Sequence, residues 1–188
     1  MIEAPRVVVV GMDFSPLAEA ALHRALRLTE ASPHATIHAV TVGRRVGKDV
    51  RLPDGCVLSQ WAALDVVRLH LAERVKQWPS SGPANLRVVG HVRGGNAAKA
   101  LLDVAFRTGS SCVVVGAHAG NPADLHRVGS VTRQVLDEAR VDVHVESPIT
   151  QMTTERMDFD PLRFAYVFGT GRRKTRHDLA MRKLGASV

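Results

Sequence analysis

The residues from 116 to 132 have the types and spacing best suited to chemistry in this chain. They read Gly-Ala-His-Ala-Gly-Asn-Pro-Ala-Asp-Leu-His-Arg-Val-Gly-Ser-Val-Thr, after an apolar run and before a helical pattern. Gly116 would end a buried strand, and Ser130 would begin an amphipathic helix. Backbone amides at such a junction can hold an anion, because the dipoles at a helix start favour negative charge. The segment therefore predicts a phosphate-binding loop.

Several residues inside this loop bear on how well it would hold a polyphosphate. Ala119 carries a methyl group where a glycine would allow positive φ and close approach of an anion, although Gly120 can compensate by a shift of one residue. Pro122 removes an amide donor, and Asp124 would repel phosphates if it pointed inward. Arg127 can form a bidentate contact with a phosphate, or it can simply be solvated. The residues alone leave nucleotide binding open.

The loop must be positioned by the elements around it, and these alternate along the chain. Apolar runs predict strands over residues 7–10, 36–42, 86–92, 112–117 and 141–145, and apolar spacing predicts helices over 16–28, 58–77, 96–108 and 130–139. Asp13 and Ser15 are both candidate caps for the first helix. The alternation predicts an α/β fold with a five-stranded open parallel sheet flanked by helices. Ligands would bind beyond the carboxyl ends of its strands.

Two segments depart from this alternation. Residues 43–53 carry four basic residues and two glycines, and we expect a mobile surface loop there. Regular alternation stops after residue 147, so we expect one domain over residues 1–147 and a basic, aromatic-containing extension, disordered or folded, over 148–188. In the last strand Val141, Val143 and Val145 alternate with polar residues. That pattern predicts an edge strand with one exposed face, suited to pairing with another chain.

Motifs in order along residues 5–147 resemble those of the universal stress protein family. They are Val-Gly-Met-Asp-Phe-Ser-Pro at 10–16, Ile-His-Ala-Val at 37–40, Val-Val-Gly at 114–116 and Gly-Ser-Val-Thr at 129–132. The family's nucleotide signature is glycine, two residues, glycine, nine residues, glycine, then serine or threonine, and Ala119 replaces its second glycine. The resemblance implies a Rossmann-like fold of the adenine nucleotide α-hydrolase type. It also implies a homodimer through Val141 to Val145.

The resemblance further implies an adenine nucleotide site, although the family also contains members without the glycine signature. Asp13 would meet the adenine end, unless it is only a helix cap, and the backbone near Ala39 and Val40 would line the adenine or ribose pocket. Glycine amides and a serine hydroxyl would meet the phosphates of ATP, with Mg²⁺ as a companion ion. The candidate binding residues are Asp13, Ala39, Val40, Gly116, Ala119, Gly120, Arg127, Gly129, Ser130 and Val131.

Three functions fit this sequence. The first is a dimeric, non-catalytic regulator of the stress response that binds ATP or another adenine nucleotide. The second is a slow ATPase that uses the same cleft, with His118, His126 and Arg127 stabilising charge. The third is a nucleotide-free interaction protein that docks partners or RNA through its basic extension. No Gly-x-Ser-x-Gly elbow, Gly-x-Gly-x-x-Gly fingerprint or P-loop is present, so we assign no catalytic residue.

Composition narrows the partners and the compartment. The chain has 25 Lys or Arg against 18 Asp or Glu, and residues 147–188 hold eight basic and four acidic residues. Most of the excess charge is therefore expected in the extension, and we do not expect a nucleic-acid partner. Two cysteines and scattered histidines predict neither a disulfide nor a metal site. Short apolar stretches and a start unlike a signal peptide predict a cytoplasmic protein without a membrane span.

Overall fold

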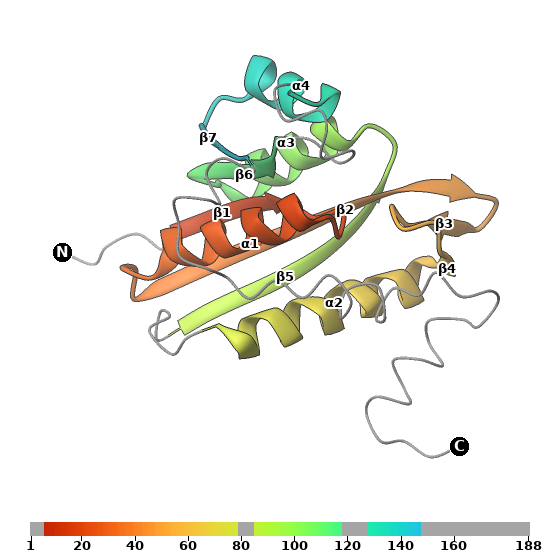
Figure 1. The fold of residues 1–188 in the computed structure, drawn as a ribbon, viewed down its shortest axis with the longest axis horizontal. Coiled ribbons are helices and arrows are strands. Elements are labelled where there is room, and N and C mark those ends of the chain that lie inside the picture. Colours follow the sequence, from red (N-terminus) through yellow and green to blue (C-terminus); the bar gives the residue numbers. More distant parts are fainter. Residues whose placement is uncertain (1–5, 79–84, 118–127, 148–188) are drawn as a thin grey trace. The chain divides into compact units, whose positions relative to one another are not determined.

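The computed structural model describes residues 6–78, 85–117 and 128–147 (Figure 1). Ala119, Gly120, Arg127 and the whole extension from residue 148 lie outside the described residues. The elements are β1 Arg6–Gly11, α1 Pro16–Thr29, β2 His34–Val46, β3 Asp49–Arg51, β4 Val57–Ser59, α2 Gln60–Gln77, β5 Asn85–Gly94, α3 Ala97–Thr108, β6 Cys112–Gly116, α4 Ser130–Glu138 and β7 Asp142–Glu146.

The predicted parallel sheet is confirmed. Strands β5, β2, β1, β6 and β7 lie side by side in that order, and every neighbouring pair is parallel. The central strands are valine runs because both of their faces are covered by helices: Val8, Val9, Val10, Val113 and Val114 are fully buried. Strand β7 pairs only with β6 among the described residues, so it forms one edge of the sheet as its alternating pattern predicts.

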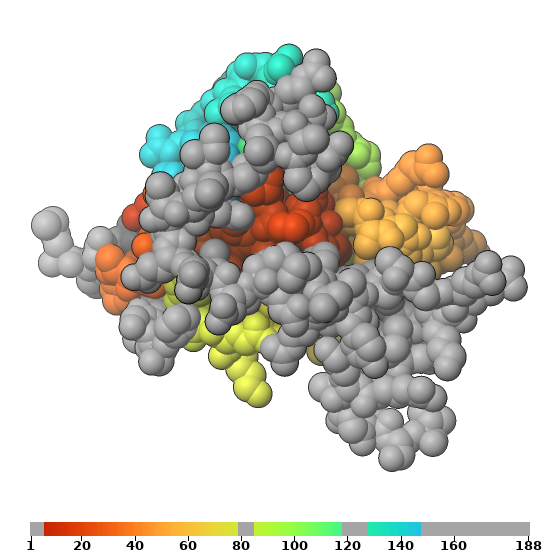
Figure 2. Space-filling model, viewed as in Figure 1, coloured from red at the N-terminus to blue at the C-terminus, as the bar shows by residue number. Residues whose placement is uncertain are grey.

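The sheet has more strands than the five predicted, and the extra ones lie in the expected surface loop. Strand β2 continues to Val46, pairs antiparallel with β3, and β3 pairs antiparallel with β4. Figure 2 shows this segment, in orange, at one end of the described residues. The buried side chains of Val50, Leu52 and Leu58 anchor it. The prediction failed because glycines and charges dominate a segment in which each short strand buries only one residue.

Gly43 allows this antiparallel extension to lie close to β2. A Cβ atom at Gly43 would stand 2.3 Å from Val50 Cγ1 and 2.7 Å from the Arg51 carbonyl oxygen.

The predicted start of the second helix, at residue 58, was also too early. Ser59 ends β4, and its Oγ accepts a hydrogen bond from the Ala62 amide at 3.2 Å, so α2 begins at Gln60.

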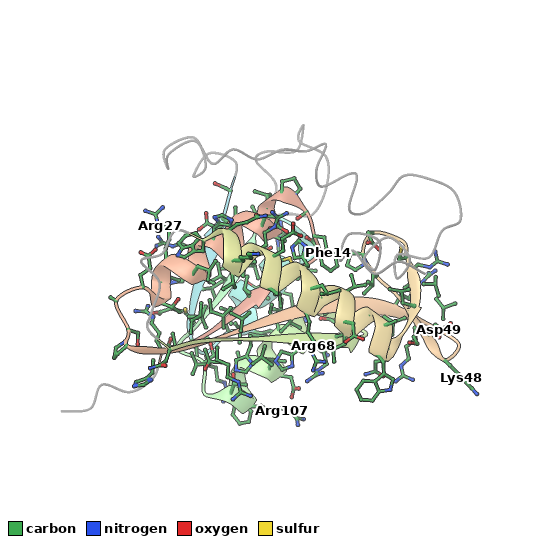
Figure 3. The ribbon with its side chains drawn as sticks, turned by 90° about the horizontal axis from the view of Figure 1, so that it is seen from below. Phe14, Arg27, Lys48, Asp49, Arg68 and Arg107 are labelled. Carbon is green, nitrogen blue, oxygen red and sulfur yellow. The ribbon has the colours of Figure 1, made fainter. Side chains whose placement is uncertain are left out.

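Helices cover both faces of the sheet. Seen from below in Figure 3, Arg27 on α1 and Arg107 on α3 lie on opposite sides of it. Helix α3 packs on the valines of the central strands through Ala98, Leu101 and Val104. Helix α2 covers β5, where a Cβ at Gly90 would meet Val67 at 3.0 Å. None of the helices in the described ranges is long and apolar enough to cross a membrane.

Candidate functional site

A pocket of about 320 Å³ opens at the carboxyl ends of β1, β2 and β6. The start of α3, the start of α4 and the loop after β1 complete its wall. Among the candidate residues it is lined by Asp13, Val40, Gly116, Gly129, Ser130 and Val131. Ala39 does not line it, because its side chain is fully buried on the opposite face of β2 from Val40. The pocket stands where ligands bind in open parallel sheets.

Hydrogen bonds hold the loop after β1 in one conformation. The Met12 amide donates to the Val40 carbonyl at 2.9 Å, and the Ser15 amide donates to Asp13 Oδ1 at 3.0 Å. Ser15 Oγ in turn accepts from the Ala18 amide at 3.2 Å, so Ser15 is the cap of α1 and Asp13 braces the loop before it. The carboxylate of Asp13 is thereby fixed at the pocket wall.

Phe14, between these two residues, has an unusual backbone. Its φ is 65°, the only positive φ at a non-glycine position in the described ranges. A bulky side chain is strained there. The ring is 2% exposed and meets the His70 ring edge-on, with centroids 5.3 Å apart. Phe14 and Arg27 lie at opposite ends of α1 in Figure 3. Packing of the Phe14 ring therefore offsets the strain and helps to shape the pocket loop.

A buried ionic cluster lies behind the Phe14 ring and joins α1 to α2. His70 Nε2 donates to Glu19 Oε1 at 2.6 Å, and Arg74 Nε pairs with Glu19 Oε2 at 2.9 Å. Glu19 is 5% exposed. Burial alone would raise the pKa of Glu19, but the hydrogen bond from His70 and the charges of His70 and Arg74 hold that pKa below its usual range. No sequence pattern predicts this cluster, because Glu19 lies about fifty residues from its two partners.

The opposite wall of the pocket is the start of α4, and it is built differently. Gly129 is the N-cap and supplies no side-chain hydrogen bond, whereas Ser15, Ser59 and Asn96 cap the other described helices. The first amides of a helix have no acceptor within it. Within the part of the chain that the structure describes, the amides of Ser130, Val131 and Thr132 have no acceptor, and they stand at the pocket wall, where the helix dipole favours an anion.

Both glycines of the motif also have structural roles. The Gly129 amide donates to the Ala117 carbonyl at 2.7 Å, and the Gly116 carbonyl accepts from Thr132 Oγ1 at 2.6 Å. A Cβ at Gly116 would stand 2.8 Å from Leu17 Cβ. These contacts dock α4 on β6 and let α1 pack closely. Because the Gly129 amide already donates to Ala117, the donors left for an anion are the amides of the residues that follow Gly129.

Most of the pocket wall between these residues is apolar, and apart from Val40 the sequence interpretation did not single it out. Its apolar side chains include those of Met12, Val40, Val42, Ala97, Leu101 and Val115. The helical apolar spacing of α3 and the alternation of β2 were the available signals, but they predict only a buried face. A flat apolar group can lie against this wall while an attached anion meets the amides of α4. Within the described ranges, no three His, Cys, Asp or Glu side chains gather as a metal site.

Fold and pocket together define a Rossmann-like α/β protein with a pocket at the carboxyl edge of its sheet. The model of the universal stress protein family matches residues 5–145, and the chain belongs to that family. A comparison with curated proteins finds no match.

Solved structures of this family share the fold. Universal stress protein UspA from Lactobacillus plantarum is 21% identical, with a TM-score of 0.53 over 74% of this chain and 96% of its own. A universal stress protein in complex with cAMP is 22% identical, with a TM-score of 0.50 over 75% and 96%. The universal stress protein from Archaeoglobus fulgidus in complex with dAMP is 20% identical, with a TM-score of 0.51 over 77% and 98%.

Proposed function

We propose that this protein is a dimeric, non-catalytic regulator of the stress response that binds an adenine nucleotide, ATP above all, in the carboxyl-edge pocket. The observation that carries the proposal is the uncapped start of α4 facing an apolar wall across one pocket. Relatives of the same fold are described in complex with cAMP and with dAMP, which supports an adenine ligand. Binding to the native state alone would stabilise the fold and couple it to nucleotide level.

Each end of the nucleotide has a matching surface. The adenine ring would lie against Val40, Val42 and Leu101, with the carboxylate of Asp13 at the edge of the loop. The phosphates would meet the amides of Ser130 and Val131, where α4 begins. Mg²⁺ would enter with the nucleotide, since its phosphates supply the oxygen ligands that this ion prefers.

The absence of catalysis is part of the proposal. Among the described residues that line the pocket, Asp13 is the only ionisable side chain, and it belongs to the loop after β1 rather than to α4. A phosphate held at α4 would then have no described general base beside it. The histidines and Arg127 of the slow-ATPase alternative lie outside the described residues. Release of ADP during prolonged incubation with ATP and Mg²⁺ would favour that alternative.

The dimer would form through the free edge of β7. Val143 and Val145 are half-buried on this strand, and a second copy pairing with it would cover the edge. In this proposal the extension over residues 148–188 acts separately from the domain over 1–147. The compartment that we propose is the cytoplasm. Light scattering of the full chain should give twice the mass of one copy, and a proline at Val143 should halve it.

Calorimetric titration of the nucleotide-stripped full chain with ATP and Mg²⁺ tests the ligand. The variant Gly129→Glu places a carboxylate at the start of α4 and should abolish saturable binding. Phe106→Glu is the matched control, because it adds the same charge at a side chain that is 84% exposed on α3. Binding that survives Gly129→Glu would refute the site, and no heat at millimolar ATP would refute the ligand.

A further inference from the structure

The sheet face on which α3 packs continues past that helix onto β2, β3 and β5, where it gathers basic side chains. The register pairs Val42 with Arg93 and Arg44 with Arg51, and alternation along each strand brings further residues to the same side. All its arginines are exposed, and β3 and β4 bury only their opposite face. We call this surface the β2–β5 basic face. Its members are His38, Arg44, Arg51, Arg87, His91 and Arg93.

The arginines of this face are arranged at a cost to the fold. Arg44 and Arg51 stand directly opposite each other on antiparallel strands, where like charges are destabilising. None of the four arginines has an ion pair with a carboxylate among the described residues, whereas Arg24, Arg68, Arg74 and Arg107 each have one. An anion from outside the domain would remove this repulsion.

The two histidines of the face form a directed hydrogen-bonded chain with Arg93. Arg93 Nη2 donates to His91 Nδ1 at 3.4 Å, so His91 Nε2 carries the proton and donates to His38 Nδ1 at 2.9 Å. The remaining nitrogen of His38 is then a donor. Burial and the charge of Arg93 lower the pKa of His91 to about 4. At neutral pH the positive charge of the face therefore comes from its arginines, and the histidines add neutral donors.

An exposed aromatic side chain lies beside this face. Trp61, at the start of α2, is 77% exposed. It lines a pocket of about 190 Å³ at the outer edge of β5, together with His91 and Arg93. Among the described residues no strand pairs with that edge of β5. An exposed indole next to a guanidinium is a platform on which a nucleobase can stack.

We propose that the β2–β5 basic face binds single-stranded nucleic acid, with phosphates on Arg44, Arg51, Arg87 and Arg93 and a base stacked on Trp61. The arginines at the two ends of β5 are six residues apart, which spans about 20 Å at the usual rise of a strand. One phosphate cannot bridge that span, but an extended strand of a few nucleotides can. The aromatic platform favours a nucleic acid over an acidic protein.

Composition placed most of the excess charge in the extension and argued against a nucleic-acid partner. The structure brings basic residues from segments some forty residues apart onto one face, including those of the expected loop at 43–53. Figure 3 shows Lys48 and Asp49 at the tip of that segment, far from Phe14 in the loop after β1. The face adjoins the nucleotide pocket, because Arg93 is paired with Val42, which lines that pocket, and it extends away from the pocket along β3 and β5.

Fluorescence anisotropy of a labelled twelve-residue uridine oligomer tests the proposal on the full chain. The double variant R87Q/R93Q should weaken binding by about tenfold at 0.1 M salt and lower the slope of log affinity against log salt by about 1.4. The matched control R107Q/R133Q removes the same charge from exposed side chains of α3 and α4, and it should change affinity by less than about twofold. Equal losses in the two variants would overturn the proposal.

Two further arms separate the alternatives. Trp61→Ala should weaken binding by at least about fivefold without changing the salt slope, because stacking adds no counterion release. Polyglutamate should compete poorly with the oligomer. Competition by polyglutamate together with no effect of Trp61→Ala would instead assign the face to an acidic protein. Gly129→Glu should leave oligomer binding unchanged, so this test and the test of the nucleotide site can fail independently.

Discussion

The two walls of the carboxyl-edge pocket are built on opposite principles. The loop after β1 is fixed by several partners at once: a cap from Ser15, a brace from Asp13 and the packed ring of Phe14. The start of α4 is docked by Thr132, but among the described residues its first amides have no hydrogen-bond acceptor. The fixed wall gives the pocket its shape, and the open wall gives it free hydrogen-bonding capacity. A binding site needs both features. Free hydrogen-bond donors bind a ligand most tightly when they are already held in place and need no rearrangement.

The largest effect should come from the fixed wall. Phe14→Ala removes a fully buried ring and should lower the free energy of unfolding by about 4 kcal/mol. Phe14→Gly should be more stable than Phe14→Ala by about 1 kcal/mol, since glycine relieves the positive φ. Urea denaturation measures both, with Phe106→Ala as a control of small effect. A glycine variant less stable than the alanine variant would show that the backbone is unstrained.

Substitution in the buried cluster behind Phe14 should cause the next largest loss of unfolding free energy. Glu19→Ala leaves the charge of Arg74 and the ring of His70 without their shared carboxylate, at a cost of about 3 kcal/mol in unfolding free energy. Glu73→Ala, an exposed glutamate on α2, should change stability by less than about 0.5 kcal/mol. Similar losses in the two variants, measured by thermal and urea unfolding, would mean that the cluster does not brace the pocket loop.

Acid should lower the stability that Glu19 gives to the fixed wall, the loop after β1, and should leave the start of α4 unaffected. The pKa of Glu19 is lowered from 4.5 by folding, so its stabilisation is present above pH 4.5 and is lost as the pH falls through the folded value. Glu19→Gln removes this dependence. The stability difference between wild type and Glu19→Gln should therefore be largest near pH 7 and shrink below pH 4.5. A difference that stays constant from pH 7 to pH 3 would exclude an ionised Glu19 as the source.

The smallest effect should come from the hydrogen bond that docks the open wall. Thr132→Val keeps the shape of the side chain but removes the donor to the Gly116 carbonyl, and it should cost about 1 kcal/mol of unfolding free energy. Thr132→Ser keeps the hydroxyl and should cost less. If the serine variant is the less stable of the two, packing rather than hydrogen bonding holds α4 in place.

The sequence predicted the parts of this molecule that depend on local pattern. Valine runs gave the parallel strands, and Ser15 and Asn96 marked two helix starts. Of the residues that line the pocket, Asp13, Val40, Gly116, Gly129, Ser130 and Val131 are candidates that the family motifs supplied. What the sequence missed depends on distant contacts. The pairing of Glu19 with His70, the positive φ of Phe14 and the strands in residues 43–59 arise only when separate segments pack together.

The most direct test of the two-walled pocket is an amide NMR titration of the ¹⁵N-labelled full chain with ATP and Mg²⁺. The largest shifts should fall on the amides of Ser130, Val131 and Thr132, and hydrogen-exchange protection of the Phe14 and Ser15 amides should hardly change. Shifts that leave the start of α4 unaffected, or a loop after β1 that becomes ordered only when ATP binds, would contradict the account.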